Sequence, residues 1–149
     1  MTRSTDRQSA RERILETAYG LFYRQGYHAT GINQIIEESG VAKATFYNQF
    51  ASKDDLWLAY AQERHRRELE EFRAAIRKYR TPRERFYAPL KVLVPWFKGN
   101  QFRGCPFQNL LAEVPQDGHP VQREAQVHKD ALRNIFKEVT LDLIEAHPE

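Results

Sequence analysis

The stretch that decides the fold is residues 30–50, TGINQIIEESGVAKATFYNQF. Its three isoleucines recur at helical spacing and predict a short helix that Thr30 caps and that closes before Gly40. A second short helix is predicted over about 43–49, and Gly40 between the two can take the positive φ of a tight turn. Two short helices joined in this way have the anatomy of a helix-turn-helix. A plain hairpin within an all-α bundle would show the same pattern.

Outside this stretch the apolar periodicity is also helical. Ser52 starts a capping-box pattern ahead of a long fourth helix, and Thr81 with Pro82 starts the next helix. Two further prolines fall inside that fifth helix, which should therefore bend or break. Including a first helix, the predicted ranges beyond the helix-turn-helix are about 9–25, 53–78, 82–98, 106–114 and 120–146.

No strand pattern or internal repeat accompanies these helices, so the sequence predicts an all-α fold. We expect an N-terminal three-helix domain with the helix-turn-helix, residues 1–55, and a second helical domain, residues 56–149. The fourth helix would be shared between the two domains. Its charged middle is interpreted as a solvated face with i,i+4 ion pairs.

Composition limits the functional classes. The 149 residues are 41% hydrophobic and 29% charged, which is typical of a globular protein, and no apolar run or targeting signal predicts a membrane segment, so a cytoplasmic location is expected. The single cysteine excludes an intramolecular disulfide, and the five histidines are never three or four residues apart, so no metal site or other cofactor is expected. A net charge of +3 permits nucleic-acid binding without indicating it.

The run from Ala10 to Leu56 resembles the N-terminal domain of the TetR/AcrR family of repressors. The resemblance rests on several short motifs in order: Leu21-Phe22, Gly26-Tyr27, Ala29-Thr30, Ile35, Gly40-Val41, Thr45-Phe46-Tyr47, Phe50 and Ser52-Lys53-Asp54-Asp55-Leu56. Further along, Arg103-Gly104-Cys105-Pro106-Phe107 resembles one branch of the family's effector domains. The resemblance implies a sequence-specific regulator, most simply a repressor that a small, largely apolar effector releases from a palindromic operator.

Two other functional classes remain open from the sequence. A truncated regulator or helical adaptor could act through heterodimers. A small helical enzyme would need a nucleophile, a base and an orienting group, which are not recognisable together, so no enzymatic activity is expected.

For DNA contacts, the resemblance implies the residues Thr30, Lys43, Thr45, Tyr47, Asn48, Gln49 and Lys53. The Thr30 hydroxyl would hold a phosphate at a helix N-terminus, and Tyr47 and Lys53 would hold the DNA backbone as well. The other four residues would face base edges or nearby phosphates. Phe46 and Phe50 would point into the core. Arg3, Arg7 and Arg11 could form a basic arm near the minor groove, or belong to a frayed terminus.

For the effector, the resemblance implies a pocket among the helices from the fourth to the last. The candidate lining residues are Trp57, Tyr60, Phe86, Leu90, Leu93, Trp96, Phe97, Cys105, Phe107, Leu110, Leu111, Leu132 and Phe136. Each of them alone is more often ordinary core than ligand contact. As a set they are rich in aromatic rings and lie beside proline breaks, which favours a mostly apolar cavity around Trp96, Phe97 and Phe107.

The last predicted helix carries a near-continuous apolar seam: Val121, Ala125, His128, Leu132, Ile135, Val139 and Leu143. TetR-like proteins usually end in two long helices that pair with those of a second copy, whereas one helix follows Gly118 here. We therefore expect the seam to lack a neighbour in its own chain and to form the interface of a homodimer.

Overall fold

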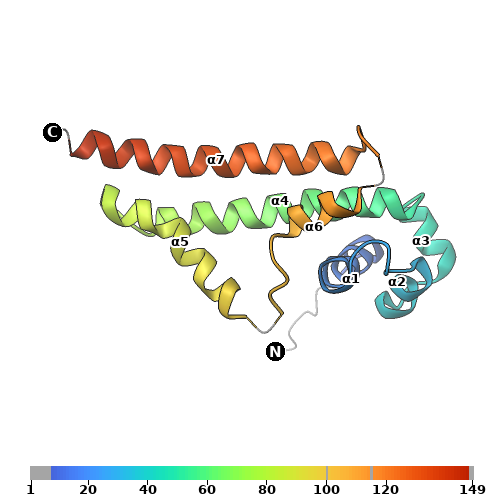
Figure 1. Cartoon of the computed structure of the whole chain (residues 1–149). Helices are drawn as coiled ribbons and strands as arrows, with labels where there is room; N and C mark the ends of the chain where they lie inside the picture. The colour runs from blue at the N-terminus through green and yellow to red at the C-terminus, as the bar shows by residue number, and fades with distance from the viewer. Residues whose placement is uncertain (1–7, 100, 115, 148–149) are drawn as a thin grey trace, which may run out of the picture.

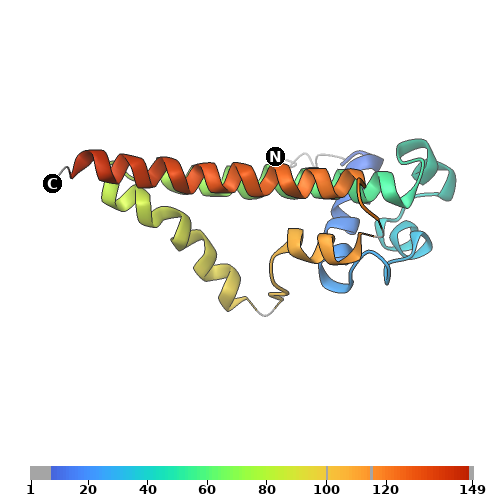
Figure 2. The ribbon, with the colours of Figure 1, turned by 45° about the horizontal axis from the view of Figure 1, so that its top comes forward.

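The computed structural model describes residues 8–99, 101–114 and 116–147, and in these residues it contains helices and no strands. The long helices α4 and α7 lie side by side, with α1 to α3 gathered at one end of the pair (Figure 1). Helix α5 diverges from the pair, and α6 returns toward α1 (Figure 2). The helices are α1 (Ala10–Gln25), α2 (Ile32–Ser39), α3 (Lys43–Gln49), α4 (Lys53–Arg77), α5 (Pro82–Lys98), α6 (Pro106–Glu113) and α7 (Pro120–Ala146). The all-α prediction is confirmed.

Local signals fix most helix starts. The hydroxyl of Thr81 accepts from the Glu84 amide, and the Glu84 carboxylate accepts from the Thr81 amide, so the predicted capping box of α5 forms. Ser52 likewise accepts from the Asp55 amide at the start of α4. Gly40, with φ 64°, makes the left-handed turn between α2 and α3. These contacts place the helix-turn-helix where the sequence predicts it.

The predicted cap of α2 is wrong. Gly31 is the N-cap, without a side-chain hydrogen bond, and Thr30 lies one residue earlier. Thr30 is fully buried, and its hydroxyl donates to the Gly26 carbonyl at 2.6 Å. The hydroxyl therefore closes the α1–α2 turn and does not cap the helix.

The prolines inside α5 do not break it. The helix continues through Pro89 and Pro95 to Lys98. Pro95 removes the hydrogen bond to the Lys91 carbonyl, but both residues are exposed, so water can solvate the freed oxygen. The prediction of a break is therefore wrong, and the alternative, a bend, stays a prediction.

Two clusters of buried side chains hold the fold together. The first joins α1 to α3 and the start of α4 with Phe107, Leu110, Val121 and Ala125 from α6 and α7. The second cluster lies at the other end of α4 and contains Leu69, Phe72, Val92 and Ile135. Helix α4 contributes to both clusters, as predicted. The first cluster contains residues from both sides of position 55. The division into domains of residues 1–55 and 56–149 stays a prediction.

The seam on α7 is covered within its own chain. Val121, Ala125, His128, Ile135 and Val139 are all buried, because α4, α5 and α6 all pack against α7. The prediction that these residues need a second chain is therefore wrong, and Leu132 and Leu143 are already partly buried too. Apolar residues that remain exposed on α7 are Val127, Leu141 and Ile144.

Within the described residues, the helices are all too short or too polar to span a membrane.

Candidate nucleic-acid interface and effector pocket

Helix α3 has one buried side and one exposed side. Phe46 is fully buried, and Ile35 of α2 and Phe50 join it in the first core cluster. Because this packing fixes the angle between the two short helices, the opposite side of α3 faces solvent. That side carries the predicted contact residues: Lys43, Tyr47, Asn48 and Gln49 are exposed, and Thr45 is half-buried.

Two predicted contacts outside α3 are placed differently. The Thr30 hydroxyl is buried and bonded to the Gly26 carbonyl, so it cannot bind a phosphate. Lys53, at the start of α4, is half-buried, with its ammonium 4.0 Å from the centroid of the Tyr27 ring. Burial lowers the pKa of Lys53, while Asp54 and Glu113 act in the opposite direction. The Lys53 charge is thus held beside the helix-turn-helix by an aromatic ring.

Of the basic arm, Arg3 and Arg7 lie outside the described residues. Arg11 lies on α1 with its guanidinium 4.3 Å above the Phe50 ring. Its Nη1 atom donates to the Gln49 carbonyl at 3.4 Å. This contact places a further positive charge beside the C-terminal end of α3, and the sequence pattern did not predict it.

The predicted pocket residues do not converge on one cavity. Trp57, Tyr60, Phe107 and Leu110 are packed in the first core cluster. Leu93, Trp96 and Leu132 border the second, Phe136 contacts Phe72, and Leu111 packs against the first. Phe86 is half-buried, and Leu90, Phe97 and Cys105 are exposed. We call α1 to α3 the head. The pocket predicted around Trp96, Phe97 and Phe107 is wrong, because Phe107 packs in the core cluster of the head and stacks on His128 of α7.

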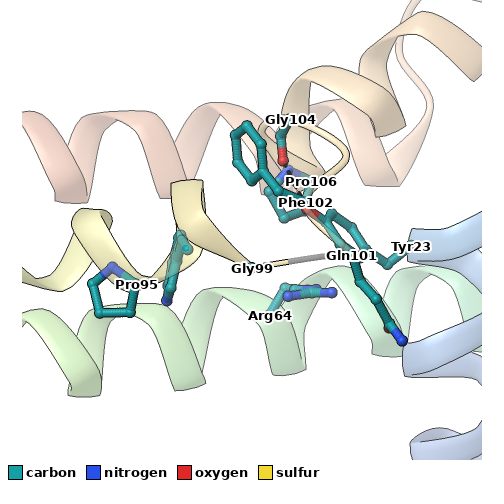
Figure 3. Close-up of a pocket in the computed structure, with 9 residues that line it drawn as sticks. Tyr23, Arg64, Pro95, Gly99, Gln101, Phe102, Gly104 and Pro106 are labelled. Carbon is teal, nitrogen blue, oxygen red and sulfur yellow. Dashed lines mark hydrogen bonds between the residues drawn. The ribbon is translucent and has the colours of Figure 1, made fainter.

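A different pocket of about 220 Å³ lies between α1, α4, the end of α5 and the segment that leads into α6 (Figure 3). Trp96 is the one predicted residue among those that line it. The lining residues are Tyr23, Arg64, Pro95, Trp96, Gly99, Gln101, Phe102, Gly104 and Pro106. Arg64 was missed because it belongs to a charged run whose sequence pattern is typical of a solvated face.

Arg64 is enclosed by aromatic rings. Its guanidinium carbon lies 4.0 Å from the centroid of the Tyr19 ring and 4.6 Å from that of Tyr23. Its Nε atom donates to the Tyr60 hydroxyl at 3.3 Å. Tyr23 in turn accepts from the Arg103 amide at 2.9 Å and donates to the Gly104 carbonyl at 3.1 Å. The pocket wall is therefore tied to the segment before α6.

A buried polar pair lies next to this cluster. Glu68 of α4 and His128 of α7 approach to 3.3 Å between Oε2 and Nε2, and both are almost fully buried. Burial raises the pKa of Glu68 to about 7. Burial, together with the nearby His65, lowers the pKa of His128 to about 4. The Phe107 ring stacks on His128 at 3.8 Å, so α4, α6 and α7 meet at this pair.

Helix α6 also holds the head directly. Glu113, at its last turn, accepts hydrogen bonds from the backbone amides of Tyr27 and His28 at 3.0 and 2.9 Å. The His28 ring bonds the Glu113 carbonyl at 3.1 Å. We call these contacts the Glu113 clamp. The clamp joins the element beside the pocket to the turn that leads into α2.

The fold therefore has two parts: a small helix-turn-helix head, and a second helical core that one long helix joins to it. This architecture defines the class of helix-turn-helix proteins with an added helical domain. A family model described as bacterial regulatory proteins, tetR family, matches residues 14–60. The regulator LmrA of Bacillus subtilis is 35% identical over 131 residues, covering 87% of this chain and 70% of LmrA. The chain belongs to the TetR family.

Two further similarities extend over most of the chain. The regulator QacR of Staphylococcus aureus is 31% identical over 134 residues, which cover 89% of this chain and 71% of QacR. The crystal structure of a TetR-family transcriptional regulator from Streptomyces coelicolor superposes with a TM-score of 0.84 at 34% identity, covering 89% of this chain. The chain spans 66% of that structure's length.

Proposed function

We propose that this chain is a sequence-specific transcription regulator that binds double-stranded DNA through α3. The observation that carries the proposal is the division of α3 into two sides. Phe46 anchors it in the core, while Lys43, Tyr47 and Asn48 project outward. A short helix presented in this way fits the major groove, where amide side chains can read adenine and hydroxyl or ammonium groups can hold phosphates.

The proposed operator is an inverted repeat bound by a homodimer. Two α3 helices related by a two-fold axis would read half-sites about one helical turn, roughly 34 Å, apart. The α7 seam is used inside the chain, so the two copies would pair through other surfaces.

We further propose that the regulator is a repressor released by a small effector in the pocket beside Trp96. The volume of about 220 Å³ is below the roughly 300–1,000 Å³ typical of drug-sized ligands, which favours a small molecule. Helix α4 and the Glu113 clamp connect the pocket region with the head. An effector that prefers one arrangement of the heads would change operator affinity by about 5- to 150-fold.

The experiment that tests this proposal is a gel-shift assay with fragments of the genome that encodes the chain, at two salt concentrations. Saturable binding to a few fragments, each with an inverted repeat, and weaker binding at higher salt are expected. A folded chain that binds all fragments alike, or none, would contradict sequence-specific regulation.

A further inference from the structure

Arg64 is a partly buried cation in the wall of the pocket. Its side chain is only 13% exposed, and the surrounding rings of Tyr19 and Tyr23 stabilise its charge through their faces. Ring faces do not replace the paired oxygen acceptors that a guanidinium fork prefers. The Nε atom of Arg64 donates to the Tyr60 hydroxyl. Among the described residues, no carboxylate accepts a hydrogen bond from its terminal nitrogens.

The nearby Glu68 does not neutralise Arg64 fully. The distance from Arg64 Nη1 to Glu68 Oε1 is 3.8 Å, which is beyond hydrogen-bond range. The other Glu68 oxygen faces His128, and burial raises the pKa of Glu68 to about 7, so the carboxyl is partly protonated at neutral pH. Arg64 thus retains positive charge without a bonded counter-ion at the edge of an open pocket.

The remaining wall of the pocket is largely apolar. Trp96, Pro95, Phe102 and Pro106 line the space. Arg64 of α4 and Tyr23 of α1 line it too (Figure 3). A cation with an apolar surround selects a molecule that has one anionic group and an apolar body. A volume of about 220 Å³ limits that body to roughly one or two rings or a short chain.

We propose that the effector pocket binds a small organic carboxylate, with its anionic group on the Arg64 guanidinium and its apolar body against Trp96 and Phe102. This rests on the proposed ligand response of the regulator and adds the chemical class of the ligand. A bidentate carboxylate would satisfy the free side of the guanidinium fork. Tyr23, whose hydroxyl holds the segment before α6, lines the same pocket and stacks on the guanidinium.

The test compares charged probes with neutral probes of the same shape. Benzoate and 1-naphthoate are titrated against benzamide and 1-naphthamide, with tryptophan fluorescence and the shift in melting temperature as readouts. Trp96 lines the pocket, whereas Trp57, the other tryptophan, is buried in the first core cluster. The variants are Arg64→Met and Arg64→Lys, and the matched control is Arg66→Met, which removes an exposed arginine two residues away.

We expect at least one carboxylate to bind about tenfold or more tightly than its amide, as a charge-assisted hydrogen bond would provide. Arg64→Met should abolish this preference for the carboxylate and leave the affinity for the amide within about twofold. Arg64→Lys should retain part of the preference, and Arg66→Met should retain all of it. If Arg64→Met does not fold, the affinities of Arg64→Lys for each acid and its amide still test the inference.

Equal binding of each acid and its amide by the unmodified chain would overturn the inference, as would an undiminished preference in both Arg64 variants. Inorganic phosphate binding as tightly as 1-naphthoate would overturn the apolar part of the site. The probes are titrated without DNA, and operator binding is measured separately without probes. Loss of the carboxylate preference and loss of DNA binding are therefore distinguishable results.

Discussion

Gly26 and Glu113 lie so close together that a Cβ atom on Gly26 would approach the Glu113 Oε1 atom to 2.6 Å. Gly26 also has φ 87° and ψ 169°, a conformation that residues with a side chain rarely adopt. The α1–α2 turn therefore needs glycine for two separate reasons. One reason is local backbone strain, and the other is the Glu113 clamp from α6.

The first prediction separates these two reasons. Gly26→Ala should lower the free energy of unfolding by about 2 kcal/mol or more, because strain and the clash both act. The control is Gly26→Ala in a Glu113→Ala background, because it keeps the backbone strain and removes the clash, so the loss there should be smaller. Urea unfolding of both variants measures the difference. Equal losses would show that Glu113 does not restrict Gly26.

The second prediction concerns the Glu113 clamp. Glu113→Ala removes the acceptor of the Tyr27 and His28 amides, so both amides should exchange with solvent about ten times faster or more. Hydrogen exchange followed by NMR measures this directly. Glu138→Ala, on the exposed side of α7, is the matched control and should leave both rates unchanged. Unaltered exchange in Glu113→Ala would mean that the clamp does not form in solution.

The third prediction concerns the pH dependence of stability. The pKa of Glu68 rises on folding from 4.5 to about 7, so Glu68 alone makes stability fall as pH rises through this window. The pKa of His128 falls on folding from 6.5 to about 4, so His128 alone makes stability rise with pH. The two effects oppose each other between about pH 4.5 and 6.5.

Substituting one member of this pair should therefore expose the slope of the other. Relative to the unmodified chain, the free energy of unfolding of Glu68→Gln should rise by about 1–2 kcal/mol from pH 5 to pH 6.5. That of His128→Gln should fall by a similar amount over the same interval. Urea unfolding at the two pH values measures both changes. Parallel pH profiles for all three proteins would contradict the assignment of the pair.

The fourth prediction concerns the α7 seam. Ile135→Ala should destabilise the chain by about 2–4 kcal/mol, by an amount independent of protein concentration, because Ile135 is buried within one chain. Ile144→Ala is the control, since Ile144 is 60% exposed and should cost less than about 0.5 kcal/mol in the monomer. Urea unfolding across a hundredfold range of concentration measures both. A loss at Ile135 that varied with concentration would restore the interchain interface.

The helices and the helix-turn-helix were predictable because their signals are local. Capping by Thr81, the glycine turn at Gly40 and the apolar spacing along each helix act within a few residues. The same locality explains the burial of Phe46, which follows from the angle between α2 and α3.

The pocket and the helices that cover the α7 seam were not predictable because they depend on which helices become neighbours. Periodicity shows that α7 has an apolar side, but not that α4 and α5 cover it. Likewise, a charged run on α4 does not reveal that Arg64 turns toward three tyrosines. The direction in which α6 packs, which places Phe107 on His128, has no local signal in the sequence.

The most direct test of the proposed regulator measures the salt dependence of DNA affinity in two matched lysine variants. Lys43→Ala removes a charge from the outward side of α3, and Lys137→Ala removes one from an exposed position on α7. Fluorescence anisotropy with a bound genomic fragment, repeated over several salt concentrations, gives the affinity and its salt slope. Lys43→Ala should weaken binding and reduce the slope by about one, while Lys137→Ala should match the unmodified chain. Unchanged affinity and slope in Lys43→Ala, or equal losses in both variants, would contradict the placement of α3 on DNA.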